Sequence, residues 1–378
     1  MLTKSYLKVI TLFALCFFFI SCGEDTPEIT QVLDVSFDTD ENSSLMFYDG
    51  ELEEEMTSVW RRYQIGNVLR VKLIDSITIE VANFAPVDIE NATVLATIEG
   101  LEKQIQLFNI PKIRAHARQE MKYSFIEGSS MFLDVDGNEV DLTAYRTEGI
   151  PVDQISFTYT GTSELISKLK SLESLKWEIK FHNYDPDSNP NNNWADEVTG
   201  KDFRRFSGLI INMGYLFLSE EFKTGFLAEH LTKNDESVMT HEEKEELYQK
   251  LLYKSYFKCG KVAKISGLGG GAVLGFAEHI LRDYLTKAAT GSVTAHEVGH
   301  TLGYNHSSNM TYPIKMDGVN VGISPLAVRV MNILFEENRF PITLANYYLA
   351  EDFQEPSSQS NMEISFQSHQ LKCAEIHK

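Results

Sequence analysis

Cysteine is scarce in this chain, with four residues in 378. Two of the four lie near the N-terminus, in a segment that we expect to be processed. Cys259 and Cys373 remain as candidates for a disulfide bond in an oxidising compartment, and nothing in the sequence decides whether they pair. A disulfide framework therefore does not hold this protein together, and the length suffices for a large core divided between two domains.

Positive charge is also in short supply. The chain has 34 Lys and Arg residues against 54 Asp and Glu residues, which gives a formal net charge of −20. Because phosphate groups would be repelled by this charge, we expect no nucleic-acid partner. The acidity favours a soluble body, and we expect that body to be a monomer.

An apolar run long enough to span a bilayer is missing at the N-terminus. Lys4 and Lys8 precede the apolar run from Val9 to Ile20, which falls short of the roughly 20 residues that a transmembrane helix needs. This pattern, a short apolar run behind positive charges, is typical of a secretion signal. We therefore expect residues 1–21 to be a signal peptide that is absent from the mature protein.

The end of that signal is similar to the lipobox of bacterial lipoproteins. Ser21 and Cys22 are a small residue followed by cysteine, with Phe19 where leucine is usual. The resemblance implies cleavage before Cys22, acylation of Cys22, a polar tether over residues 22–30 and anchoring in the outer membrane of a cell envelope. The acidic residues after the cysteine are also found in lipoproteins that are exposed on the cell surface. The alternative is an ordinary signal peptide with a coincidental cysteine.

Short alternating segments dominate residues 31–190. Leu69–Leu73 and Ile77–Val81 place apolar side chains at every second position, as half-buried strands do. Asp136-Gly137 is a strong signal for a β-hairpin turn. The pattern predicts a β-rich N-terminal domain that resembles a β-sandwich. We expect His116, which has arginines two residues away on both sides, to be exposed to solvent.

Two polar stretches could be interpreted as calcium sites. Asp134, Asp136 and Asn138 alternate like calcium ligands, but no glycine falls at the sixth position that a calcium loop requires. The polar segment 185–193 carries many side-chain oxygens, yet a bare linker is the simpler interpretation. Ca²⁺ therefore lacks support, and the second stretch places a domain boundary near residues 185–200.

Residues 191–353 combine helix and strand signals. Thr240 stands as a helix N-cap and Glu243 follows at the third helical position, so a capping box predicts a helix that runs to about residue 256. The segment 206–218 is apolar and is compatible with either a helix or a strand. Residues 354–378 are polar, and we expect them to form a loosely ordered tail.

Residues 295–313 contain the pattern that organises the chain. His296 and His300 are four positions apart, so a helix would present both imidazoles on one face within reach of one Zn²⁺. Glu297 lies beside the first histidine, where it can take a proton from a water molecule on the metal. Gly303 allows the chain to leave the helix, and His306 can return as a third ligand. Three protein ligands leave one position open, which is typical of a catalytic zinc site.

The spacing HExxHxxGxxH resembles that of the metzincin metallopeptidases. The resemblance implies a methionine turn beneath the zinc, which we assign to Met310, with Met316 as the alternative because only four residues separate Met310 from His306. Tyr312 stands where related enzymes place a tyrosine that approaches the zinc and stabilises the oxyanion. A packed aromatic ring before Pro313 is an equally good interpretation.

A glycine cluster precedes the histidine pattern. Gly269, Gly270 and Gly271 lack the Gly-Lys-Ser/Thr continuation of a nucleotide-binding loop. The metzincin resemblance implies that they lie at a strand that borders the substrate cleft and pairs with an extended peptide. A plain bent loop is the alternative.

Together these features predict an α+β protein in which a β-sandwich-like domain precedes a metzincin-like α/β zinc-peptidase domain. The expected activity is endopeptidase cleavage of extracellular proteins or peptides, with one catalytic Zn²⁺ and Glu297 as general base. The alternative is a surface adhesin or another binding lipoprotein whose zinc is structural. An intact Glu297 speaks against this alternative, because a structural site needs no base.

Overall fold

A computed structural model describes residues 32–37, 44–182 and 193–354 of the chain. The predicted signal peptide, the tether with Cys22, the polar linker up to residue 192 and the C-terminal tail with Cys373 lie outside these ranges. In the described part the chain is a mixed α+β protein with nine α-helices and several sheets, which confirms the predicted class. None of the helices in these ranges is both long and apolar enough to cross a membrane.

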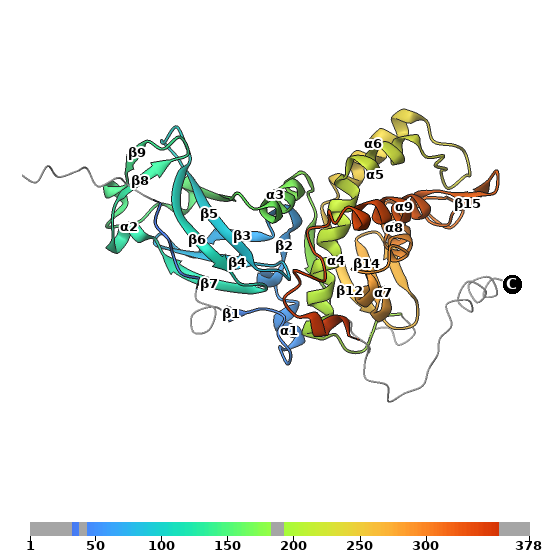
Figure 1. The fold of residues 1–378 in the computed structure, drawn as a ribbon, viewed down its shortest axis with the longest axis horizontal. Coiled ribbons are helices and arrows are strands. Elements are labelled where there is room, and N and C mark those ends of the chain that lie inside the picture. The colour runs from blue at the N-terminus through green and yellow to red at the C-terminus, as the bar shows by residue number, and fades with distance from the viewer. Residues whose placement is uncertain (1–31, 38–43, 183–192, 355–378) are drawn as a thin grey trace, which may run out of the picture.

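The first part of the chain forms two antiparallel sheets, at the left of Figure 1. Buried aliphatic side chains on both sheets, such as Val81 and Val94, belong to the same hydrophobic core. The first sheet has the order β1 (Ser44–Leu45), β7 (Ala117–Lys122), β4 (Thr78–Asn83) and β3 (Leu69–Leu73). The second has the order β10 (Ile155–Thr160), β5 (Ile89–Ile98), β6 (Ile105–Ile113), β8 (Met131–Asp134) and β9 (Glu139–Asp141).

The Asp-Gly turn predicted from the sequence joins β8 to β9, so the hairpin is confirmed. The Oδ1 atom of Asp134 accepts hydrogen bonds of 2.8 Å from the backbone N–H groups of Asp136 and Asn138. Gly137 has a φ of +85°, which favours glycine at this position. The carboxylate that a calcium interpretation would have used therefore caps the turn.

A third sheet carries the predicted catalytic region. Its order is β13 (Gly267–Gly270), β14 (Val273–Ala277), β12 (Tyr256–Val262), β11 (Glu178–Phe181) and β2 (Tyr63–Gln64). The three central strands are parallel, and both edge strands run antiparallel to their neighbours. Two strands of this sheet, β2 and β11, come from residues before the polar linker.

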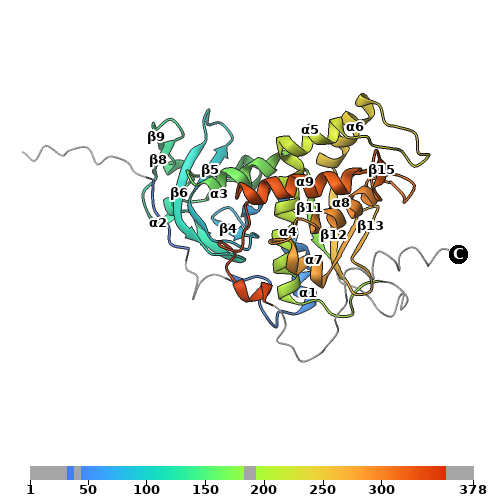
Figure 2. The same cartoon turned by 45° about the vertical axis from the view of Figure 1, so that its right-hand side comes forward.

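Helix α4 (Gly200–Leu218) lies between the two N-terminal sheets and the third sheet (Figures 1 and 2). The apolar segment that was ambiguous in the sequence is therefore helical. Thr199 caps this helix and forms a capping box with Asp202. Sixteen of its residues are buried, because neighbouring elements cover it on several sides.

Further helices complete this half. They are α5 (Glu220–Ala228), α6 (His241–Leu252), α7 (Glu278–Asp283), α8 (Thr290–Thr301) and α9 (Ile323–Glu336), and the hairpin β15 (Ile314–Met316) and β16 (Val319–Val321) connects α8 to α9. The capping box of Thr240 and Glu243 is confirmed at the start of α6. The short helices of the first half are α1 (Glu53–Met56), α2 (Ser124–Glu127) and α3 (Glu164–Ser171).

The C-terminal segment returns to α4 through polar side chains around the buried Arg204, which we call the Arg204 junction and which comprise Arg204, Asp49, Tyr347 and Asp352. Arg204 is 1% exposed and binds both carboxylate oxygens of Asp352, at 2.7 and 2.8 Å. It also donates to Asp49 at 2.9 Å and to the carbonyl of Phe47 at 2.7 Å. The hydroxyl of Tyr347 donates to Asp352 at 2.9 Å. Every donor and acceptor at the centre of this junction therefore has a partner.

The expectation for His116 was wrong. Its ring is fully buried beside Phe47 and Tyr348, with ring centroids 5.3 and 5.7 Å away. The β6–β7 turn that carries His116 is held inward by backbone hydrogen bonds, which Met46 donates to His116 and His116 donates to Ala85. Burial, aided by the charge of Arg204, holds the pKa of His116 well below its usual value, so the ring is neutral.

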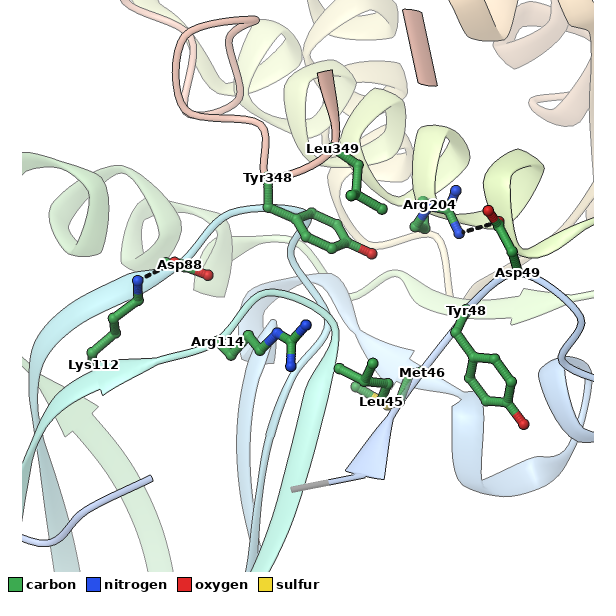
Figure 3. Close-up of a pocket in the computed structure, with 10 residues that line it drawn as sticks. All are labelled: Leu45, Met46, Tyr48, Asp49, Asp88, Lys112, Arg114, Arg204, Tyr348 and Leu349. Carbon is green, nitrogen blue, oxygen red and sulfur yellow. Dashed lines mark hydrogen bonds and ion pairs between the residues drawn. The ribbon is translucent and has the colours of Figure 1, made fainter. Parts of the chain in front are cut away.

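A cavity of about 540 Å³ opens beside the Arg204 junction (Figure 3). Charged side chains from both halves of the chain line it, but several of these charges already have partners. Lys112 pairs with Asp88 at 2.7 Å, and Arg204 pairs with Asp49. The cavity is a seam between the N-terminal sheets and α4, on a different part of the molecule from the three histidines.

Candidate metal centre

Helix α8 carries the first two histidines of the predicted site. It begins at Thr290 and ends at Thr301. Ala295 and Val298 are completely buried and fix one side of the helix in the core. His296 and His300 therefore project together from the side that is partly open to solvent.

The structure brings all three predicted histidines together. The Nε2 atom of His300 lies 3.1 Å from Nε2 of His296 and 3.0 Å from Nε2 of His306. Ligand atoms of the three rings all fall within 4.8 Å of one another. The return of His306 depends on Gly303, which ends the helix with a φ of +98° as the sequence predicted.

Hydrogen bonds behind the rings decide which nitrogen atoms face the centre. Nδ1 of His300 lies 2.7 Å from the carbonyl oxygen of Tyr304, and the ring of His296 bonds to the backbone of Thr311. A carbonyl can only accept, so Nδ1 of His300 donates this bond, and Nε2 of His300 faces the other two histidines. Burial, with the neighbouring histidine rings, lowers the pKa of His296 to about 4 and keeps it neutral.

Glu297 is buried beside these rings, with 6% of its surface exposed. Its Oε1 lies 4.0 Å from Nε2 of His296. Burial raises the pKa of this carboxyl to about 8, and the backbone hydrogen bond from Gly269 opposes that shift. A carboxyl in this environment can take up and release a proton near neutral pH.

The edge strand β13 passes directly over Glu297. A Cβ atom on Gly269 would lie 2.2 Å from the carbonyl oxygen of Glu297, and one on Gly267 would lie 2.5 Å from its side chain. Gly270 and Gly271, with φ of +155° and +56°, instead lead into the turn to β14. A Cβ atom on either of them would meet no other atom within 4 Å. The sequence missed Gly267, which belongs to the same glycine-rich segment.

Met310 and Met316 occupy different environments. Met310 is completely buried, and a Cβ atom on Gly299 of α8 would lie 1.7 Å from the carbonyl oxygen of Met310. Met316 is 37% exposed on β15. The turn that contains Met310 therefore packs against the histidine helix, and the alternative residue lies on the hairpin beyond it.

Tyr312 lies between two of the histidines. Its ring centroid is 4.7 Å from that of His296 and 4.6 Å from that of His306. The side chain is 43% exposed, so solvent or a bound molecule can reach it.

Two lysines, one near the end of α6 and one just after it, also support the site, and no local sequence pattern marks them. Lys250 donates to the carbonyl of Leu302 at 3.2 Å. Lys254 donates to Thr301 at 3.1 Å and to Gly271 at 2.7 Å. The positive charges meet the negative end of the α8 dipole and connect that end to the β13–β14 turn.

The only predicted disulfide partner within the described ranges is Cys259, which is a free, buried thiol on β12. Burial raises its pKa above the ordinary value.

Three imidazole rings converge on one point, beside a buried carboxyl and an edge strand. Imidazole nitrogens are donors that can bind borderline cations such as Zn²⁺. No family model, no curated protein and no solved structure matches the chain.

Proposed function

We propose that this protein is a zinc-dependent endopeptidase with a metzincin-like catalytic half. The single observation that carries the proposal is the convergence of three histidine Nε2 atoms beside a buried Glu297. A structural zinc site has no use for a base next to the metal, whereas hydrolysis requires one.

The arrangement of elements supports the finer assignment. Helix α8 lies against β13, the antiparallel edge of the third sheet, and the Met310 turn packs on α8. In this proposal residues 31–190 contain the sandwich-like domain and residues 191–353 the catalytic domain. Strands β2 and β11 would be contributed to the catalytic sheet from the first range.

His296, His300 and His306 would hold the zinc ion. The bound ion would polarise the peptide carbonyl and make a water molecule acidic enough to be deprotonated. Glu297 is placed to act as the general base: it would accept a proton from a water molecule in the site and pass it to the departing amine. The Tyr312 hydroxyl can donate a hydrogen bond to the developing oxyanion.

The substrate would be an extended protein or peptide segment. Strand β13 is paired with β14 along one edge, and one of its faces lies against Glu297. An added strand would place its backbone along the other edge of β13. Gly267 and Gly269 keep the strand flat against the catalytic residue.

The test is cleavage of casein or a peptide library by the purified protein, with and without a chelator. We expect cleavage that the chelator abolishes and that Glu297→Ala lacks. Glu246→Ala, which changes an exposed glutamate on α6, serves as the control and should cleave normally. Equal cleavage by wild type and Glu297→Ala would sink the mechanism. Tight zinc binding without any cleavage would favour the adhesin.

We also propose that Cys22 anchors the protein to the bacterial outer membrane. A diacylated or triacylated cysteine holds a protein stably at a membrane. Cys22→Ala should move the protein from the detergent phase to the aqueous phase in a phase-partitioning experiment. A variant that stays in the detergent phase would refute the anchor.

A further inference from the structure

The third histidine is held differently from the other two. His296 and His300 lie on α8, but His306 lies on a turn, residues 303–312, that has no helix or strand to fix it. We call this segment the ligand turn. It contains three buried polar residues, Ser308, Asn309 and Thr311, with exposures of 1%, 0% and 0%. Buried polar groups need partners, so the contacts of this turn determine where His306 can be.

Ser308 and Asn309 find partners in one loop, residues 229–240, which joins α5 to α6 and which we call the support loop. The hydroxyl of Thr311 instead bonds within the turn, to the carbonyls of Asn305 and Ser308. The support loop lies on the same side of the molecule as the β15–β16 hairpin (Figures 1 and 2). The support loop is distant in sequence, since Thr232 and Asn309 are 77 positions apart. None of its residues belongs to the HExxHxxGxxH pattern.

Asn309 is the main connection. Its Oδ1 accepts from the backbone N–H of Thr232 at 2.7 Å and from the Thr232 hydroxyl at 3.2 Å. Its Nδ2 donates to the carbonyl of His230 at 2.6 Å, and its own N–H donates to the Thr232 hydroxyl at 3.1 Å. The Ser308 hydroxyl adds a 2.6 Å bond to the carbonyl of Thr232. Together these bonds fix the chain just after His306.

Asn234 makes the matching connection before His306. Its Nδ2 donates to the carbonyl of Gly303 at 3.0 Å, and its Oδ1 accepts from the N–H of Asn305 at 2.9 Å. Thr232 and Asn234 therefore hold the ligand turn on both sides of the one histidine that no helix orients.

We infer that Thr232, Asn234 and Asn309 are positioning residues that set the metal affinity of the site by fixing His306. This inference rests on the proposed function. A metal ligand that is already held in place loses little conformational entropy when the metal binds. Loosening it therefore lowers the metal affinity before it lowers the stability of the fold. Loss of groups that orient a ligand typically costs about 10- to 100-fold in metal affinity.

The variants are chosen as matched pairs. Thr232→Val removes the hydroxyl and keeps the shape of the side chain, whereas Thr232→Ser keeps the hydroxyl. Asn309→Ala is compared with Asn212→Ala, since Asn212 is also buried and bonds Ile342 through both amide atoms, away from the histidines. Asn234→Ala is compared with Asn346→Ala, an exposed asparagine with similar backbone bonds at Pro341 and Thr343.

The measurements are the zinc dissociation constant, by competition with a chelating dye, and the visible spectrum of the Co²⁺-loaded protein. Thermal melts of the metal-free variants report any general loss of stability. We expect about 10-fold weaker zinc binding or more in Thr232→Val, Asn234→Ala and Asn309→Ala, with an altered Co²⁺ spectrum. Thr232→Ser, Asn212→Ala and Asn346→Ala should bind zinc like the wild type, even where Asn212→Ala melts earlier.

The outcomes separate the two proposals. If the wild type binds zinc and the three site variants bind it equally well with an unchanged Co²⁺ spectrum, the positioning role is wrong and the proposed function stands. Affinities that simply follow the melting temperatures, controls included, also overturn the positioning role. A wild type that binds no zinc overturns the proposed function, and the positioning role falls with it.

Discussion

The histidine centre and the Arg204 junction each gather several polar side chains around one point, but the side chains are satisfied in opposite ways. At the junction, the guanidinium of Arg204 meets the carboxylate of Asp352 in a paired geometry, with Asp49 and a carbonyl completing its bonds. At the histidine centre, the Nε2 atoms of His296 and His300 lie 3.1 Å apart, with that of His306 3.0 Å from His300. Complementary charges hold a fold together, whereas converging imidazole nitrogens offer donors to a bound cation.

The largest effect that would test this comparison is expected for His300→Ala. Removal of the central donor should abolish peptide cleavage and weaken zinc binding by at least about 100-fold, because two imidazoles cannot complete the site. The free energy of unfolding of the metal-free protein should fall by no more than about 1 kcal/mol, since the change removes one hydrogen bond to Tyr304. Calorimetric zinc titration and urea unfolding with a chelator measure the two quantities. A metal-free variant that unfolds several kcal/mol more easily would make the centre structural.

The converse effect is expected at the junction. Asp352→Ala leaves the buried guanidinium of Arg204 without its main partner, and such a change costs about 3–5 kcal/mol in the free energy of unfolding. Zinc affinity in the folded variant should stay unchanged. Glu337→Ala is the control, because the pair of Glu337 with Arg339 is partly exposed and such pairs contribute about 1 kcal/mol or less. Urea unfolding measures the free energy of unfolding of Asp352→Ala and Glu337→Ala. Equal decreases in the two variants would contradict the stabilising role of the junction.

The two regions also differ in how far the sequence could predict them. The histidine spacing lies within eleven consecutive residues, and helix geometry together with Gly303 determines where the three rings go. The site could therefore be placed without any knowledge of the rest of the fold. The mixed α+β class, the hairpin at Gly137 and the capping box of α6 followed from equally local signals.

Features that depend on distant contacts were missed. Arg204 and Asp352 are 148 positions apart, and nothing local marks them as partners. The support loop, Lys254 and Gly267 were missed for the same reason. His116 was expected at the surface because its neighbours in sequence are charged, whereas its neighbours in space are the rings of Phe47 and Tyr348.

The smallest effect is expected at Tyr312, and it tests whether the centre is built for catalysis as well as for binding. The hydroxyl of a tyrosine that stabilises an oxyanion acts only in the transition state, so Tyr312→Phe should lower kcat and leave KM and zinc affinity unchanged. Removal of a buried donor costs about 100-fold or more, but Tyr312 is 43% exposed and water can replace part of its role, so a loss on the order of 10-fold is expected. Tyr253→Phe, at a 58% exposed site, is the control. If neither kcat nor KM changes in Tyr312→Phe, the ring only packs between His296 and His306. If KM rises on the order of 10-fold while kcat stays unchanged, the hydroxyl acts in substrate binding.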